Sequence, residues 1–141
     1  MSIYDSTQTN ESQRSARIYQ DLNLDFQQNT ATKDIQKITD VEAVKRAVRN
    51  LINLNHYEKP FHPEIGSNLR AMLFENMTPQ MTHLIGKQIE LLIANYEPRA
   101  RLVTVRTLPQ FDRNAYAVTI NFQIVNQPEP IVVETLLERL R

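Results

Sequence analysis

Glu97, Pro98 and Arg99 form the local feature of this sequence that is best suited to chemistry or recognition. A residue that precedes proline avoids the helical region, so we expect Glu97 to be extended where a helical pattern ends. Side chains two residues apart in an extended chain point to the same side, which brings a carboxylate next to a guanidinium. The pair would either form an internal salt bridge or bind carboxylates or carbonyls of another chain. The residue types alone do not choose between these alternatives.

A second group of chemically capable residues, His56, His62 and Glu64, lies within nine residues of one predicted loop. Imidazole and carboxylate groups are common zinc ligands. This spacing matches no zinc-binding motif, however, and histidines on a surface loop are the simpler interpretation. We therefore predict no metal site and no cofactor.

Hydrolysis of a glycoside would need two acids about 5–10 Å apart, one of them with a raised pKa. The chain has 16 Asp and Glu residues, so some pair of acids will always lie close together. Glu97 and Glu75 are the candidates, and Glu97 alone stands in a context that is compatible with burial. Ser67 lacks the Gly-x-Ser-x-Gly turn that exposes a nucleophilic serine. We assign no catalytic residue.

The overall composition excludes several classes of function. The 141 residues carry 16 Lys and Arg and 16 Asp and Glu, so the formal net charge is zero. This balance argues against binding nucleic acid or an anionic membrane through bulk charge. Cysteine is absent, which excludes disulfides, and two glycines are too few for the usual phosphate-binding loops. No apolar run approaches the roughly 18 residues of a spanning helix, and the polar start is unlike a signal peptide.

The first predicted helix covers residues 41–54, with Asp40 as its N-cap. Its apolar residues recur at helical spacing, and basic residues occupy the opposite face. A loop over residues 56–66 follows, in which Gly66 would supply a positive φ.

Two further helices are predicted before the Glu-Pro-Arg segment. Ser67 can cap a short helix that runs to about Glu75. Thr78 followed by Pro79 is the expected start of a longer helix, because proline is favoured at the first helical position. Pro98 ends this helix.

After Pro98 the hydrophobic period changes from about 3.6 to 2, which predicts strands over residues 100–109, 115–126 and 131–140. The last segment also fits a helix, but its β-branched start favours a strand. The predicted fold class is α+β, with N-terminal helices packed on a C-terminal three-stranded antiparallel sheet. One face of the central strand should lie on one stripe of the long helix: Tyr116, Val118, Ile120, Phe122 and Ile124 against Met81, Ile85, Ile89 and Leu92.

The domain organisation follows from the composition of the first residues. Residues 1–22 have few apolar side chains, so we expect a flexible arm that orders only on a partner. Residues 24–29 alternate briefly and predict a short strand. Residues 23–141 are expected to form a single α+β domain.

Several stretches of the sequence together resemble one known family. They are VKRAVRNLI at 44–52, KPFHPEIGSNL at 59–69, LFENMTP at 73–79 and NYEPR at 95–99, followed by the strand pair. In their order and spacing, they resemble the baseplate wedge family of contractile phage tails whose members initiate the sheath. The same family includes a baseplate component of type VI secretion systems. LDFQQNTATKD at 24–34 also fits, so the resemblance covers about residues 24–140.

The resemblance implies two binding surfaces. Glu97, Pro98 and Arg99 would dock the protein onto a helical bundle formed by other wedge subunits. The C-terminal sheet would exchange strands with the first ring of sheath subunits. In the last strand this role would fall on Ile131, Val133, Thr135, Leu136 and Leu137.

The resemblance also implies where the protein works. The expected partners are other baseplate wedge proteins and the tail sheath protein, with the tail tube nearby and six copies in each ring. No nucleic acid or membrane partner is expected. The protein would be a structural part of the virion, assembled in the host cytoplasm, and not an enzyme. Some family members carry a lysozyme label, so a muralytic glycosidase using Glu97 and Glu75 is the alternative. An adaptor of a cellular secretion system would share the same fold.

Overall fold

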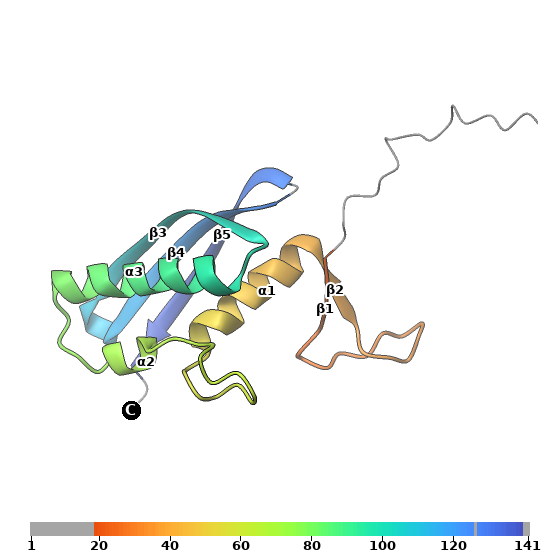
Figure 1. The fold of residues 1–141 in the computed structure, drawn as a ribbon, viewed down its shortest axis with the longest axis horizontal. Helices are drawn as coiled ribbons and strands as arrows, with labels where there is room; N and C mark the ends of the chain where they lie inside the picture. Colours follow the sequence, from red (N-terminus) through yellow and green to blue (C-terminus); the bar gives the residue numbers. More distant parts are fainter. Residues whose placement is uncertain (1–18, 126, 140–141) are drawn as a thin grey trace, which may run out of the picture.

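The computed structural model describes residues 19–125 and 127–139, and Figure 1 shows how the helices lie against the larger sheet. The element bounds are β1 Gln20–Leu22, β2 Lys37–Thr39, α1 Asp40–Asn53, α2 Leu69–Met72, α3 Pro79–Tyr96, β3 Ala100–Gln110, β4 Ala115–Ile124 and β5 Gln127–Glu138, with a 3₁₀ turn at Phe111–Arg113. The predicted α+β class is confirmed.

The larger sheet is antiparallel, has the strand order β3-β4-β5, and contains the strands expected from the period-2 pattern. The last segment, which also fitted a helix, is the strand β5. The edge strands β3 and β5 flank the central strand β4. The inward side chains of β4 are all buried: Tyr116, Val118, Ile120, Phe122 and Ile124. Burying each such side chain stabilises the fold by about 1.5–3 kcal/mol.

The helices cover one face of this sheet and leave the other face open (Figure 1). Helix α3 packs along β3, and α1 packs against β5 and α3. Ile85, Ile89 and Leu92 of α3 are buried in the same core as the inward face of β4, as the helical stripe predicted. Met81, the first member of that stripe, is only partly buried.

Helix α1 begins one residue earlier than predicted, and Asp40 is not its N-cap. Thr39 takes the N-cap position, with extended backbone and no side-chain cap. Asp40 has a φ of 48° and accepts a hydrogen bond from the backbone N–H of Tyr19 at 3.2 Å. The Asp40 side chain therefore joins the helix to the preceding strand pair, because a partner distant in sequence takes its carboxylate.

The loop between α1 and α2 is braced by its own backbone. Gly66 has a φ of 143°, so the predicted positive φ is confirmed. A Cβ at this position would lie 2.6 Å from the carbonyl carbon of Asn55, since the two chain segments form a parallel bridge here. Tyr57 and Phe61 also have positive φ values and are exposed.

Helix α3 begins as its cap residues predicted, whereas α2 does not. The N-cap of α2 is Asn68, without a side-chain cap, and Ser67 lies one residue earlier, where its Oγ accepts from the N–H of Leu69 at 3.4 Å. Helix α2 also ends at Met72 instead of near Glu75. Thr78 caps α3 by accepting from the N–H of Met81 at 3.2 Å, and Pro79 is its first residue.

The N-terminal part corrects two predictions. Residues 1–18 of the expected arm lie outside the described residues, but residues 20–22 form β1 and pair with β2. The arm therefore does not extend to residue 22. The predicted strand over 24–29 is wrong, because this segment forms turns and a single bridge between Gln28 and Ile35. Strands β1 and β2 and the turns between them, residues 20–39, form the N-terminal hairpin. Arg46 of α1 holds this hairpin by hydrogen bonds to Asn23 and Asp25.

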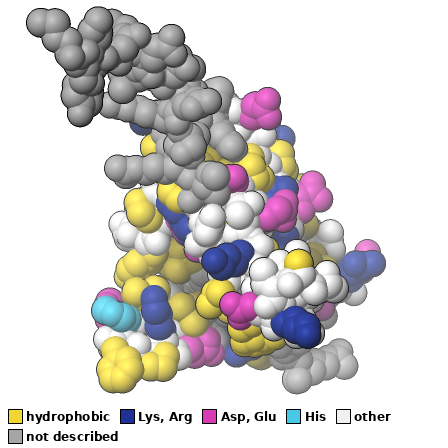
Figure 2. Space-filling model, turned by 90° about the vertical axis from the view of Figure 1, so that its right-hand side faces the viewer, with side chains coloured by type: hydrophobic (Ala, Val, Ile, Leu, Met, Phe, Trp, Pro, Cys, Tyr) yellow, Lys and Arg dark blue, Asp and Glu magenta, His cyan; other side chains and the backbone are white. Residues whose placement is uncertain are grey.

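Figure 2 shows the side of the molecule on which α1 and the hairpin lie. Basic and acidic side chains are interspersed over the described part of this face, and no large area of one sign forms. Hydrophobic side chains are exposed between them. Within the described residues no helix has the length and apolar character needed to cross a membrane.

Candidate functional site

The carboxylate of Glu97 and the guanidinium of Arg99 form a two-point ion pair where α3 passes into β3. Arg99 Nε donates to Glu97 Oε1 at 2.6 Å, and Arg99 Nη2 donates to Glu97 Oε2 at 2.9 Å. Glu97 is 5% exposed, so this pair is largely shielded from water. Bidentate pairs of this kind are among the strongest side-chain hydrogen bonds. The internal salt bridge, one of the two alternatives from the sequence, is therefore present.

Proline chemistry explains why the pair forms at this junction. Glu97 closes α3 by donating its N–H to the carbonyl of Ile93 at 2.9 Å. Its backbone, with φ −126° and ψ 76°, has left the helical region, as expected before proline, but it is not in the predicted extended conformation. The carbonyl of Glu97 then accepts from the N–H of Ala100 at 3.1 Å, which starts β3. Pro98, between the paired residues, is exposed.

Arg99 also holds the N-terminal hairpin. Its Nη1 donates to both carboxylate oxygens of Asp21, at 3.2 and 3.4 Å, and its guanidinium lies 5.7 Å from the centre of the Tyr19 ring. The hydrogen bonds that Arg99 donates to Glu97, together with the charge of Glu97 and the weaker effect of Asp21, raise the pKa of Arg99 above its ordinary value. One guanidinium therefore ties β1 to the α3–β3 junction.

Asp21 and Tyr19 are the site residues that sequence reasoning missed. Both lie in the segment that was assigned to the flexible arm. Asp21 is 78 residues from Arg99 in the chain, so no local spacing connects them. Tyr19-Gln20-Asp21-Leu22 has no apolar–polar alternation and is too short to predict a strand.

The second candidate site is the free edge of β5. Ile131, Val133 and Leu137 are buried, and Thr135 is half-buried, so these side chains point into the core. Leu136 points outward and is 37% exposed. Among the described residues, the backbone of residues 131–138 hydrogen-bonds to β4 alone. The opposite edge of this segment is open. Alternate residues of a strand turn their main-chain groups to opposite edges, so Leu136 faces one edge of β5 while Ile131, Val133, Thr135 and Leu137 face the other. The hydrogen bond from the N–H of Arg139 to the carbonyl of Asn114 continues this alternation and places Leu136 on the open edge.

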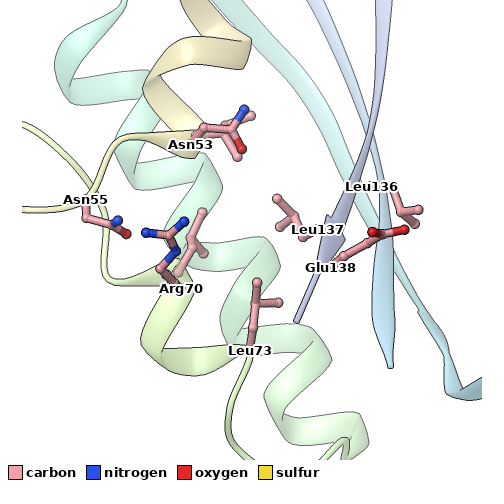
Figure 3. A pocket seen from close by; sticks show the side chains of 9 residues that line it. Asn53, Asn55, Arg70, Leu73, Leu136, Leu137 and Glu138 are labelled. Carbon is pink, nitrogen blue, oxygen red and sulfur yellow. The ribbon is translucent and has the colours of Figure 1, made fainter. Parts of the chain in front are cut away.

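A groove of about 420 Å³ lies beside the C-terminal end of β5 (Figure 3). In this view Leu137 points from β5 toward the helices, while Leu136 projects on the other side of the strand. Asn53, Asn55 and Arg70 line the opposite wall. The groove is open and of mixed polarity, so it suits a chain segment better than an enclosed small molecule.

The acids and histidines do not assemble a reactive centre in the described part of the chain. Both carboxylate oxygens of Glu97 accept hydrogen bonds from Arg99, as in a structural ion pair. Glu75 is exposed. His62 Nδ1 lies 3.1 Å from Glu64 Oε1 on the surface, and His56 is exposed. No group of three His, Cys, Asp or Glu side chains that could hold a metal ion is found among the described residues.

Comparisons with known proteins agree with this architecture. Residues 39–129 match the model of the family "Baseplate wedge protein gp25". The chain is 30% identical over 115 residues to the baseplate wedge protein gp25 of Enterobacteria phage T4, covering 82% of this chain and 86% of that protein.

Two solved structures have a similar fold. A putative tail lysozyme from Geobacter sulfurreducens matches with a TM-score of 0.65 and 15% identity, over 71% of this chain and 91% of that one. A chain in the baseplate of the anti-feeding prophage matches with a TM-score of 0.61 and 20% identity, over 88% of each chain. At these identities the likeness concerns the fold alone, so the lysozyme name carries no activity to this chain.

Proposed function

Since the chain belongs to the baseplate wedge protein gp25 family, we propose that it is a structural subunit of a contractile-tail baseplate whose sheet starts the tail sheath. The observation that carries the proposal is the open edge of β5. An edge strand presents unpaired N–H and C=O groups, which form a template for a strand of another chain. The segment that holds Ile131, Val133, Thr135, Leu136 and Leu137 would supply this template, through the main-chain groups that face away from β4.

Docking on other wedge subunits is assigned to Glu97, Pro98 and Arg99. Since Glu97 is buried against Arg99, its role here is to hold the guanidinium in place. The groups left for a partner are the exposed ring of Pro98 and the outer part of Arg99, whose side chain is 24% exposed. A carboxylate or carbonyl of the partner could replace Asp21 on Arg99 Nη1.

The assembly around this subunit is proposed from the family. Six copies would form a ring around the tail tube, with other wedge proteins at the docking motif and the sheath protein at the sheet. The protein would reside in the tail baseplate of the virion after assembly in the host cytoplasm. No nucleic acid, membrane or cofactor is part of this proposal.

Proline substitution tests the templating role. Proline removes a main-chain donor, and successive residues of a strand point their N–H groups to opposite edges. Val133→Pro and Leu136→Pro therefore remove donors on opposite edges of β5. Loss of a donor on the open edge should leave the wild-type melting curve unchanged, so the melting curve identifies which variant has lost it. We expect this variant to give complete baseplates that carry tubes without sheath, and electron microscopy would show them. Leu136→Ala is the matched control, because it keeps the donor and should sheathe normally.

Two results would count against this assignment. Normal sheaths on baseplates of a folded proline variant would contradict strand templating. Clearing of a peptidoglycan suspension by the purified protein, lost in Glu97→Gln, would instead support the glycosidase alternative.

Docking is tested by Pro98→Ala. The Pro98 ring takes no part in the Glu97–Arg99 hydrogen bonds, so the fold should persist. We expect weaker co-purification with the other wedge subunits, and unchanged co-purification for Pro109→Ala in β3. Equal recovery of both variants would place the docking surface elsewhere.

A further inference from the structure

The three strands of the larger sheet carry different charges. Strand β3, with the sequence ARLVTVRTLPQ, contains two arginines and no acid. Strand β4, AYAVTINFQI, has no charged residue. Strand β5, QPEPIVVETLLE, contains three glutamates and no lysine or arginine. The zero net charge of the whole chain therefore conceals a sheet with one basic edge and one acidic edge.

The strand register aligns these charges on the open face. Arg106 of β3 pairs with Thr119, and Thr119 pairs with Glu134 of β5, which gives one row across the sheet. Residues directly opposite each other in a sheet lie on the same face. Arg106 and Glu134 are both exposed, on the face that the helices leave uncovered. Glu138 follows two rows further along β5.

These charges have no ion-pair partner in the described part of the chain. The ion pairs there involve neither the arginines of β3 nor Glu134 and Glu138. The outer strands β3 and β5 of the three-stranded sheet are about 10 Å apart, which is close to the distance over which about 0.1 M salt screens exposed charges. A strand added beside β5 would lie at only about 5 Å. An incoming strand can therefore neutralise the glutamates, while β3 cannot.

The two edges also differ in how open they are to pairing. Strand β3 has a register shift between Leu102 and Thr104, and Pro109 lacks a donor. Bulges and prolines are devices that protect an edge from further pairing. Between residues 131 and 138, β5 has neither feature. A second copy could offer only this protected β3 edge or another β5, whose glutamates would face those of the first. The receptive edge is therefore the acidic one, and its occupant is a different chain.

We propose that the β5 edge selects a basic strand, so that the sheath segment it accepts carries lysine or arginine where it faces Glu134 and Glu138. This inference depends on the proposed templating function and specifies the chemistry of its partner. Main-chain hydrogen bonds hold the added strand, and the glutamates decide which strand is accepted. Each opposite-charge pair across two strands favours pairing by up to roughly fivefold.

Two capped eight-residue peptides test the selection with the full chain, one alternating Thr and Lys and the other alternating Thr and Glu. Because the chain has no net charge, bulk attraction favours neither peptide. We expect the lysine peptide to bind at least about fivefold more tightly. Its binding should shift the backbone amide resonances of residues 131–138. In the variant Glu134→Lys/Glu138→Lys the preference should reverse. Glu75→Lys/Glu90→Lys, an equal charge change outside β5, should leave it unchanged.

Three results would overturn the inference. The first is equal binding of the two peptides, or no binding of either. The second is a set of shifts confined to residues outside β5. The third is concentration-dependent association of the wild-type chain in sedimentation experiments that Arg106→Glu abolishes, because the occupant of the edge would then be a second copy.

Electron microscopy of assembled tails separates this inference from the proposed function. If the proline variant of β5 blocks the sheath and Glu134→Lys/Glu138→Lys does not, templating stands and charge selection fails. If the proline variant builds normal sheaths, the proposed function itself fails. If the proline variant and Glu134→Lys/Glu138→Lys both lose the sheath, and the Glu75→Lys/Glu90→Lys control keeps it, templating and charge selection are both supported.

Discussion

The carboxylate of Asp21 lies 3.2 Å from the guanidinium of Arg99, although 78 residues separate them in the chain. Arg99 is at the same time the partner of the buried Glu97. The proposed docking motif and the N-terminal hairpin therefore share one cation. A change at either surface is expected to reach the other through Arg99.

Arg99→Ala should lower stability, because it leaves the buried Glu97 carboxylate without its hydrogen-bond donors. We expect a loss of about 2 kcal/mol in the free energy of unfolding and a melting temperature lower by several degrees. Thermal unfolding followed by circular dichroism measures this. Arg101→Ala, an exposed arginine of β3 without an ion pair in the described residues, is the control and should melt like the wild type. Equal melting of both variants would mean that the pair contributes nothing to the fold.

Asp21→Ala should detach the hairpin while the core remains folded. The Asp21–Arg99 pair is partly exposed, so its loss should change global stability by less than about 1 kcal/mol. Hydrogen exchange should accelerate at residues 20–22 and 37–39 and stay unchanged in β4. Asp34→Ala, in the same hairpin but away from Arg99, is the matched control. Unchanged protection of the hairpin would show that the Asp21–Arg99 pair is not needed to hold it.

Gly66→Ala should be strongly destabilising. The new Cβ would meet the Asn55 carbonyl at 2.6 Å, and the φ of 143° disfavours a side chain. We expect a loss of more than about 2 kcal/mol in urea unfolding. Gly86→Ala is the internal control, because its Cβ would meet only the Thr107 side-chain oxygen at 3.3 Å within a helix. That variant should range from nearly neutral to stabilised by up to about 1 kcal/mol.

The pKa of Glu58 should lie below its ordinary value, because its carboxylate accepts hydrogen bonds from the backbone N–H and the side chain of Asn55. A carboxyl group with a depressed pKa in the folded state contributes stability at neutral pH, which is lost as the pH falls through that pKa. Asn55→Ala keeps the backbone donor and removes the side-chain donor. Its Glu58 midpoint in an NMR titration should therefore move only part of the way back, and a full return would show that the backbone bond is absent.

The larger sheet and the long helix could be predicted because their patterns are long and regular. The alternation from Tyr116 to Ile124 and the Thr78-Pro79 start of α3 both reflect local rules, and both are confirmed. The Glu97–Arg99 pair was one of two alternatives, because sequence spacing can bring two side chains together but does not determine what else approaches them.

The errors lie where distant residues decide local structure. Asp40 is a good N-cap by type, but its carboxylate binds the N–H of Tyr19. Strand β1 has only three residues and is held by β2 and by Arg99, so its own sequence carries too little pattern to predict it. A polar composition indicates an arm, whereas pairing with β2 and the ion pair between Asp21 and Arg99 hold residues 20–22 in place.

The antiparallel register of β4 with its neighbours places Arg99 and Arg139 at opposite ends of the larger sheet. Ala100 pairs with Ile124 at one end, and the N–H of Arg139 bonds to the carbonyl of Asn114 at the other. A ten-residue strand such as β4 spans roughly 30 Å between these ends. A gold or fluorescent label fused ahead of Tyr19 would therefore start at the docking motif, and one fused after Arg139 would start near the groove beside β5. The position of each label along the tail axis would then give the orientation of the subunit directly.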